Sequence, residues 1–290
     1  MRVVSTKYKA QYIVANPVMS KDNNKSVVLI TGASSGIGEA LAIEYARCGA
    51  NLILAARRED KLKALSERLS KDGTRVVFSA CDVTKDGDLE RIVSLGQSTF
   101  GKIDIVIANA GFGVKGPLDT ITISDYRRQF ETNVFGVLRT IYATLDSLKK
   151  SRGRLVIIGS VMGHIAIPDA SPYSMSKFAV RALCESIRLE LAPYGVSVTL
   201  ISPGYVASEF RQVDNAGKVD ETLQETAPKE LLMGADCAAQ EIAQAIMNRR
   251  DEAIITTHGK IAVFFRRNFP SLVSAVLARV LAQDRKEKTS

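Results

Sequence analysis

The sequence predicts one α/β domain, in which helices cover both faces of a doubly wound, mostly parallel sheet of seven strands. The first observation is that apolar, β-rich runs alternate strictly with amphipathic helical stretches, which favours β–α–β units joined by right-handed crossovers. The second is that several runs, such as residues 27–30, are apolar at every position, as strands buried on both faces are. No internal repeat or low-complexity linker divides the 290 residues, so we expect a single domain.

The expected strands are short, and the connections between them hold the helices. We place the strands at residues 26–31, 51–56, 75–80, 103–108, 154–159, 196–201 and 252–256. Amphipathic stretches follow the first three at 36–48, 59–70 and 86–100, and a longer helix covers residues 173–193. The main domain therefore spans 26–257. We expect a flexible, polar lead-in over residues 1–25, with Met19 as an alternative start, and an amphipathic, basic extension over 258–290.

Charge and composition exclude some classes of function. The formal net charge is +8, with 46% hydrophobic and 24% charged residues, which is ordinary for a soluble globular protein. Residues 260–290 contain seven Lys/Arg and two Asp/Glu, so they contribute about +5. The chain has no tryptophan and no basic motif with interleaved aromatic residues. We therefore expect no nucleic-acid partner.

The four cysteines do not suggest a metal or redox site. Cys48, Cys81, Cys184 and Cys237 are far apart, with no CxxC pair and no neighbouring histidine cluster. Each lies in an apolar helix or strand pattern, so we interpret all four as small buried apolar residues. Unpaired cysteines fit a reducing compartment, and the apolar stretches of residues 1–25 are too short for a signal-peptide core. We expect a cytoplasmic protein that needs no metal.

A glycine-rich turn follows the first expected strand directly and opens the first helix. Gly32 allows the tight turn, while Gly36 and Gly38 let the backbone approach a pyrophosphate and let the helix pack on the strand. The helix N-terminus offers free N–H groups to the phosphates. The sequence therefore predicts a dinucleotide site formed by Gly32, Ser34, Ser35, Gly36, Ile37 and Gly38.

The end of the second expected strand indicates which dinucleotide binds. NAD sites carry an acidic residue there for the ribose hydroxyl, but Ala56 is followed by Arg57 and Arg58. Guanidinium groups hold a 2′-phosphate through charged hydrogen bonds, whereas a carboxylate repels it. The alternative is that both arginines cap a solvated helix, although cations are unfavourable at a helix N-terminus. We predict that Arg57 and Arg58 select NADP(H) over NAD(H).

Three side chains at the carboxyl edge of the expected sheet can transfer a proton. Ser160 ends the fifth strand, and Tyr173 and Lys177 stand four positions apart on one helix face. A phenol with a pKa near 10 is a poor catalyst at neutral pH. A cation at about 4 Å, at an effective dielectric near 20, supplies the roughly 4 kcal/mol that lowers this pKa by about three units. We expect Lys177, helped by oxidised nicotinamide, to lower the pKa of Tyr173 while Ser160 holds the substrate oxygen.

These motifs together resemble the short-chain dehydrogenase/reductase family. Thr31-Gly32-x3-Gly36-Ile37-Gly38 is similar to the family's cofactor turn, and Ser160-x12-Tyr173-x3-Lys177 is similar to its catalytic signature. The resemblance covers residues 26–257 and implies a Rossmann-type fold. It also implies further site residues: Asp82 and Val83 beside the adenine, Asn109, Ala110 and Gly111 beside the cofactor, Asn133 as a fourth catalytic residue whose backbone holds a water, and Pro203, Gly204, Val206 and Ser208 on the nicotinamide side. Ser208 stands where many members have threonine.

The resemblance further implies a reaction and an assembly. NADPH would deliver hydride to a carbonyl carbon while Tyr173 protonates the oxygen held by Ser160, and the reverse would oxidise a secondary alcohol. Members are commonly dimers or tetramers, so we expect a homo-oligomer. Two alternatives stay open. One is a 3-oxoacyl-thioester reductase, which needs a basic surface for its acyl carrier; the other is a non-catalytic NADP(H)-binding sensor or scaffold, which usually lacks the Tyr or the Lys.

Two segments that extend from the carboxyl edge are expected to border the substrate. Residues 161–172 are mostly apolar, with Met162 and Ile165 among them, which favours an apolar, lipid-like carbonyl compound. We interpret His164 as a loop residue and not a second acid–base group, because Tyr173 and Lys177 already fill that role. Residues 209–234 mix charges with few apolar side chains, as a mobile lid does, and identify no particular ligand.

The extension predicts two amphipathic helices that separate at Pro270. Arg266, Arg267 and Arg279 interrupt its apolar residues too often for a membrane-spanning segment. Three placements stay open: packing on the protein's own body or a partner subunit, covering the mouth of the substrate site, or peripheral contact with an anionic membrane surface. Arg-Arg-x-x-Pro tails that resemble this one occur in membrane-associated steroid and retinoid dehydrogenases of the family.

Overall fold

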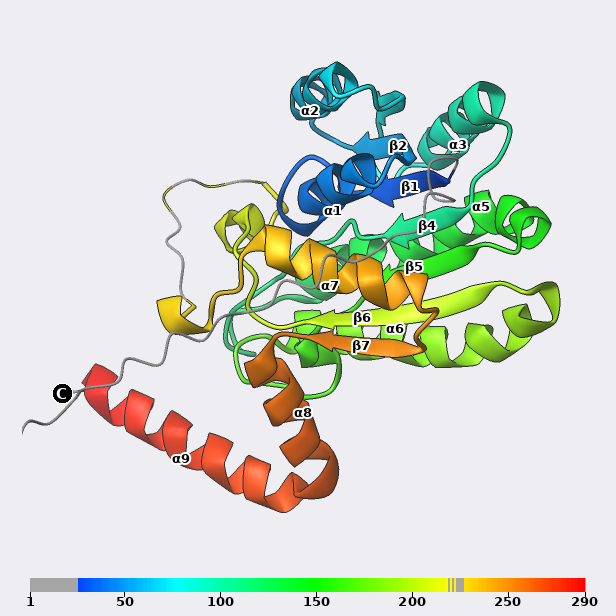
Figure 1. Cartoon of the computed structure of the whole chain (residues 1–290). Helices are drawn as coiled ribbons and strands as arrows, with labels where there is room; N and C mark the ends of the chain where they lie inside the picture. The colour runs from blue at the N-terminus through cyan, green and yellow to red at the C-terminus, as the bar shows by residue number, and fades with distance from the viewer. Residues whose placement is uncertain (1–25, 219, 221, 223–226, 290) are drawn as a thin grey trace, which may run out of the picture.

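A parallel β-sheet forms the centre of the molecule. The computed structural model describes residues 26–218, 220, 222 and 227–289, without the side chains of 280–289. Within these residues the sheet has seven strands in the order β3-β2-β1-β4-β5-β6-β7 (Figure 1), and every neighbouring pair is parallel. The strands are β1 (Val27–Thr31), β2 (Asn51–Ala56), β3 (Val76–Ala80), β4 (Ile105–Ala108), β5 (Arg154–Ile158), β6 (Ser197–Pro203) and β7 (Glu252–Ile255). The predicted sheet is therefore confirmed; the predicted lead-in over residues 1–25 lies outside the described residues.

Helices cover both faces of the sheet, as expected for a doubly wound fold. One face carries α1 (Gly36–Arg47), α2 (Glu59–Lys71) and α7 (Ala235–Met247), and the other carries α3 (Asp88–Phe100), α5 (Gly136–Ser151) and α6 (Ser171–Leu191). The short helix α4 (Ile123–Phe130) continues into α5 through a π-helical turn, η2 (Glu131–Phe135). Short 3-10 helices lie in the loops: η3 (Val161–Gly163), η4 (Ala192–Tyr194), η5 (Glu209–Gln212) and η6 (Lys229–Leu231).

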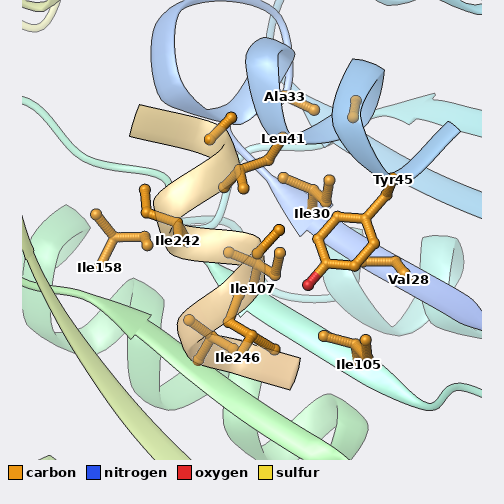
Figure 2. Packing of buried hydrophobic residues seen from close by; sticks show 14 of the residues in the cluster. Val28, Ile30, Ala33, Leu41, Tyr45, Ile105, Ile107, Ile158, Ile242 and Ile246 are labelled. Atoms are coloured by element: carbon orange, nitrogen blue, oxygen red, sulfur yellow. The ribbon is translucent and has the colours of Figure 1, made fainter. Parts of the chain in front are cut away.

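The core is divided by the sheet into two apolar clusters, and β1 contributes to both. Val28 and Ile30 belong to the cluster on the side of α1 and α7, and Figure 2 shows both beside the ring of Tyr45. Val27 and Leu29 belong to the opposite cluster. Successive strand residues face opposite sides, so a strand covered on both faces must be apolar throughout. The continuous apolar runs of the sequence have this origin.

The sheet changes winding direction between β1 and β4. The chain proceeds outward from β1 through β2 to β3, and then crosses back to β4 and proceeds through β5 and β6 to β7. Loops from the carboxyl ends of β1 and β4 therefore leave in opposite directions and open a crevice, which is where doubly wound sheets bind ligands.

The C-terminal extension forms two helices, as predicted. Helix α8 (Thr257–Asn268) leaves the carboxyl end of β7, and α9 (Pro270–Thr289) folds back from it, so that the two form a V at the edge of the molecule (Figure 1). Among the described residues no single helix is long and apolar enough to cross a membrane. Taken together, α8 and the part of α9 up to Arg279 meet that criterion, with a 117° bend between them.

The four cysteines lie in different environments, and none of them forms a disulfide. Cys81 and Cys184 are buried, as expected, and Cys48 is half-buried. Cys237, however, is exposed, and its interpretation as a buried residue is wrong. It occupies the outer side of α7, whose inner side carries the buried Ala238 and Ile242, so an apolar helical pattern alone did not determine which way the thiol points.

Candidate active site

A cavity of about 1820 Å³ extends along the carboxyl edge of the sheet, bounded by the loops that follow β1 to β6 and by the C-terminal helices beyond β7. Of the predicted site residues, Gly38 and Asn133 do not line it. Those that do are Gly32, Ser34, Ser35, Gly36, Ile37, Arg57, Arg58, Asp82, Val83, Asn109, Ala110, Gly111, Ser160, Tyr173, Lys177, Pro203, Gly204, Val206 and Ser208. The fold thus brings together residues that are up to 176 positions apart (208 − 32).

Close backbone contacts shape the glycine turn. Gly32 and Gly36 have φ angles of +65° and +57°, in the left-handed region that glycine tolerates best. A Cβ atom on Gly36 would lie 2.9 Å from that of Ser208, so the loop after β6 packs directly on the turn. Gly38 lies behind the turn against the carbonyl oxygen of Gly32. Its role is helix packing, which explains why it does not line the cavity.

Thr31 and Asn109 clamp the turn to the loop after β4. The amide of Asn109 donates to the carbonyl oxygens of Thr31 at 2.9 Å and Gly32 at 3.2 Å. In return, the hydroxyl of Thr31 accepts the backbone N–H groups of Asn109 at 3.0 Å and Ala110 at 3.1 Å. The predicted Asn-Ala-Gly turn is therefore hydrogen-bonded to the glycine turn, and Thr31 takes part in the same hydrogen-bond network.

The start of α1 fits the pyrophosphate of a dinucleotide. Ser35 precedes the helix, and its side chain caps none of the free N–H groups of the first turn. The hydroxyls of Ser34 and Ser35 line the cavity beside these groups, and Gly36 adds no side chain. Unsatisfied N–H donors at a helix N-terminus attract an anion. The donors present here therefore match a phosphate ligand.

Both predicted arginines face the cavity and are already engaged. Arg57 donates to the carbonyl oxygen of Gly217 at 2.6 Å. Arg58 donates to the hydroxyl of Ser35 at 2.7 Å and forms an ion pair with Glu209 at 2.8 Å. Sequence reasoning missed Glu209, because nothing in the local pattern of η5 indicates that its carboxylate reaches the end of β2. This carboxylate competes with an anionic ligand for Arg58.

Ser160 and Tyr173 meet at the centre of the cavity. Ser160 follows β5, and its hydroxyl oxygen accepts the backbone N–H of Met162 at 3.1 Å within the turn η3. Tyr173 lies in the first turn of α6, and its hydroxyl is hydrogen-bonded to that of Ser160. The ring of Phe210 lies 5.5 Å from the ring of Tyr173. The serine is held by the short turn after its strand, and the tyrosine by the start of a long helix.

The protonation of this pair differs from the expectation. Desolvation raises the pKa of Tyr173 to about 12, although the hydroxyl of Ser160 and the positive charge of Arg211 act in the opposite direction. Burial lowers the pKa of Lys177 to about 8. In the protein alone, therefore, the expected lowering of the phenol's pKa by Lys177 does not occur. Exclusion of water outweighs the effect of the neighbouring charge, which the four-residue spacing could not indicate.

Asn133 is a structural neighbour of the cavity. Its side-chain oxygen accepts the backbone N–H of Phe112 at 3.1 Å, and its amide donates to the carbonyl oxygen of Phe112 at 3.0 Å and to the hydroxyl of Ser176 at 3.2 Å. It lies in the π-helical turn η2, and such turns are frequent at functional sites. Its side chain fixes the loop after β4 relative to α6, beside Lys177.

His164 does not line the cavity, in keeping with its interpretation as a loop residue. It is buried at the end of η3, with its Nε2 atom 3.0 Å from both the hydroxyl of Ser202 and the carboxylate of Glu252. It thus connects the loop after β5 to the edge strand β7. No sequence motif linked these three residues.

The end of the cavity nearest β7 is mostly apolar. Met162, Ile165 and Ile167 of the loop after β5 line it, as predicted, and residues of the extension line it as well. Those of the extension are His258, Ala262, Phe265, Val273 and Leu277. The sequence left three placements of the extension open, and lining the substrate end of the cavity was one of them. Among the described residues, no group of three or more His, Cys, Asp or Glu side chains could hold a metal ion.

The cavity, with its glycine turn and its Ser–Tyr–Lys group, defines a dinucleotide-binding oxidoreductase. A family model described as short chain dehydrogenase matches residues 26–219. The chain belongs to the short-chain dehydrogenase/reductase family. Members of this family bind a nicotinamide cofactor and act on hydroxyl or carbonyl groups of small-molecule substrates.

Similar proteins come from distant organisms. The chain is 34% identical over 253 residues to 11-beta-hydroxysteroid dehydrogenase A of Sesamum indicum, which covers 84% of this chain and 71% of that protein. It is 32% identical over 286 residues to dehydrogenase/reductase SDR family member 7B of Xenopus tropicalis, and the match covers 91% of this chain and 88% of that protein.

Solved structures of the family share the fold. An alcohol dehydrogenase from the archaeon Thermococcus sibiricus, complexed with 5-hydroxy-NADP, superimposes with a TM-score of 0.69 at 30% identity, and covers 80% of this chain and 96% of that one. A short chain dehydrogenase/reductase from Burkholderia phymatum, in complex with NAD, gives a TM-score of 0.77 at 25% identity over 86% and 95%. The two neighbours thus bind different nicotinamide cofactors.

Proposed function

We propose that the protein is an NADP(H)-dependent oxidoreductase that interconverts an apolar carbonyl compound and its secondary alcohol. The observation that carries the proposal is that Ser160, Tyr173 and Lys177 line the same cavity as the glycine turn. Hydride transfer and proton transfer must converge on one carbonyl group, and such an arrangement holds the reactants in register.

The protein's own residues supply the proton and the orientation. NADPH, when bound, supplies the hydride. Because the hydroxyl oxygen of Ser160 already accepts the N–H of Met162, its own proton can point at the substrate oxygen. A pKa of about 12 keeps the phenol of Tyr173 protonated at neutral pH, so it is ready to protonate the oxygen as hydride reaches the carbon. The protonated phenol is the form that carbonyl reduction requires.

Selection of NADP(H) is supported by two cations at the end of β2. Arg57 and Arg58 both line the cavity, and Lys61 lies one turn further along, 3.8 Å from Glu209. A 2′-phosphate would replace Glu209 as the partner of Arg58, since a phosphate accepts more charged hydrogen bonds than one carboxylate. The bound 5-hydroxy-NADP of the archaeal relative is in keeping with this proposal.

A second candidate is reduction of a 3-oxoacyl thioester. Arg127, Arg128 and Lys218 line the cavity, and their charges suit an acidic carrier protein or a phosphorylated thioester. The apolar loop with Met162 and Ile165 accommodates an acyl chain equally well. This candidate therefore shares the chemistry of the first and differs in the group attached to the ketone.

The decisive experiment measures oxidation of NADPH and NADH with a panel of apolar ketones, steroids and 3-oxoacyl thioesters. We expect NADPH oxidation with ketones or steroids, and a KM for NADH at least about tenfold higher than that for NADPH. Turnover confined to the thioesters would establish the second candidate. NADPH binding without turnover of any of these compounds would contradict both and indicate a sensor or scaffold.

We also propose a cytoplasmic homo-oligomer. Large apolar side chains are exposed on α5 and α6, namely Tyr142, Met175, Phe178 and Leu189, and such residues suit a subunit interface.

Peripheral membrane contact through the extension is proposed as well, because apolar Phe264 and Leu272 are exposed there near several cations. Light scattering checks the first proposal, and liposome flotation with and without residues 260–290 checks the second.

A further inference from the structure

The C-terminal extension shares a cavity with the catalytic tyrosine. Strand β7 is the edge of the sheet next to β6, and α8 begins at its carboxyl end, on the same side as the loop that carries Pro203 and Gly204. Phe265 of α8 and Leu277 of α9 line the cavity together with Tyr173. Part of the cavity is therefore lined by residues outside the part of the chain that matches the family model, which ends at residue 219.

The two sides of α9 differ in exposure. Val273 and Leu277, one helical turn apart, are half-buried and line the cavity. Leu272 and Val276, also one turn apart, are exposed at 55% and 50% and do not line it. Residues four apart share a helix face, so α9 turns one apolar pair toward the cavity and a second pair, of the same two residue types, away from it.

A chain of polar contacts fixes α8 to the body of the protein. Arg267 donates to both carboxylate oxygens of Glu252, at 2.8 and 3.1 Å, and this carboxylate also lies 3.0 Å from Nε2 of the buried His164. The hydrogen bond from His164 lowers the pKa of Glu252 to about 2, and Arg267 acts in the same direction against the opposing effect of burial. The carboxylate is therefore charged at neutral pH and bridges α8 to the loop after Ser160.

We propose that α8 and α9 form the outer wall of the substrate site and that Phe265, Val273 and Leu277 contact the apolar part of an elongated carbonyl substrate. The inference rests on the proposed function and adds a class of substrate to it. The carbonyl lies at Ser160 and Tyr173, and the apolar part extends past Met162 toward the extension. Long apolar ketones bind more tightly because their chains contact this wall, whereas short ketones do not reach it.

The experiment compares two double variants that remove the same two residue types from two neighbouring faces of α9, of which only one lines the cavity. Val273→Ala/Leu277→Ala shortens the side that lines the cavity, and Leu272→Ala/Val276→Ala shortens the exposed side. Two methyl ketones with a propyl and a nonyl chain serve as substrates with NADPH. Binding of the nonyl ketone to the NADP-loaded full-length protein is measured separately, by displacement of the apolar dye anilinonaphthalene sulfonate, and thermal unfolding checks that both variants fold.

We expect Val273→Ala/Leu277→Ala to weaken nonyl ketone binding, and to lower kcat/KM for that ketone, about tenfold, or about 1.4 kcal/mol. Its kcat/KM for the propyl ketone stays within about twofold. Leu272→Ala/Val276→Ala leaves all three values unchanged. Equal effects of the two variants, or a loss that is the same for both ketones, would overturn the proposal. Binding that changes as expected in a protein without ketone turnover would leave the wall in place and contradict the proposed reaction.

Discussion

The amine of Lys177 lies 5.6 Å from the centre of the Tyr173 ring, and it donates its hydrogen bond to the carbonyl oxygen of Ile158 at 2.8 Å. The lysine is thus tied to the last residue of β5, immediately before the loop that carries Ser160. Its charge faces the ring of the tyrosine, while the phenol hydroxyl is bonded to the serine. The three groups hold each other in place, yet the protein alone leaves the phenol a weak acid.

Replacement of Tyr173 by Phe tests whether this phenol transfers the proton. The variant should bind NADPH with unchanged affinity, because the glycine turn and both arginines are intact. Its kcat should fall by at least about 100-fold, the lower range for loss of a general acid. Cofactor fluorescence measures binding and NADPH absorbance measures turnover. Activity near that of the unaltered protein would exclude Tyr173 as the proton donor.

The pH dependence should follow Lys177, since its pKa is lowered by burial to about 8. The positive form is present below that pH and is lost as the pH rises through it. The pKa of Tyr173, about 12, keeps the phenol neutral over the same interval. We therefore expect kcat/KM for NADPH, at saturating ketone, to be constant below pH 8 and to fall above it. A decline that begins only in the usual lysine range, about pH 10, would contradict this assignment.

The positions of the strands along the chain could be predicted because burial on two faces leaves a local pattern. The start of β4 was placed two residues early, at 103, although pairing begins at Ile105. Ile103 is buried and therefore continues the apolar run. The backbone N–H of Asp104 still donates to the carbonyl oxygen of Val27 at 2.9 Å, but the N–H of Val27 bonds to the carboxylate of Asp104 at 2.8 Å. A side-chain contact of this kind does not change the apolar pattern, so the boundary could not be read from it.

The candidate site likewise has local features that the sequence predicts and long-range features that it does not. The glycine turn and the group of Tyr173 and Lys177 are compact motifs, and their spacing places them on one helix or one turn. The ion pair of Arg58 with Glu209 joins residues about 150 positions apart, and such a contact leaves no periodicity in the sequence. The pKa of Tyr173 was expected to fall because only the neighbouring charge was visible, whereas its direction depends on how much water the whole fold excludes.

The choice of cofactor should depend on Arg57 and Arg58. Replacing either by Ala removes one or two charged hydrogen bonds to the proposed 2′-phosphate, each worth about 1.5–3 kcal/mol. We expect the KM for NADPH to rise roughly 10- to 100-fold, with little change for NADH. Arg68→Ala is the control, since Arg68 lies on the exposed side of α2 and pairs with Glu39 at 3.2 Å. A parallel loss for NADH in the two test variants would indicate damage to the fold of the site and not loss of phosphate recognition.

The position of the C-terminal wall should depend on Arg267. Arg267→Ala removes both contacts to Glu252 and frees the end of α8, so the KM for the nonyl ketone should rise several-fold, while kcat/KM for the propyl ketone stays within about twofold. Arg267→Lys keeps one charged contact and should restore part of the affinity. Lys260→Ala removes a cation from the same helix, one that pairs with Glu241 at 3.4 Å on the exposed side, and should have no effect. Loss of activity toward both ketones in Arg267→Ala would show that the contact supports the catalytic loop through His164, and would contradict a role confined to the wall.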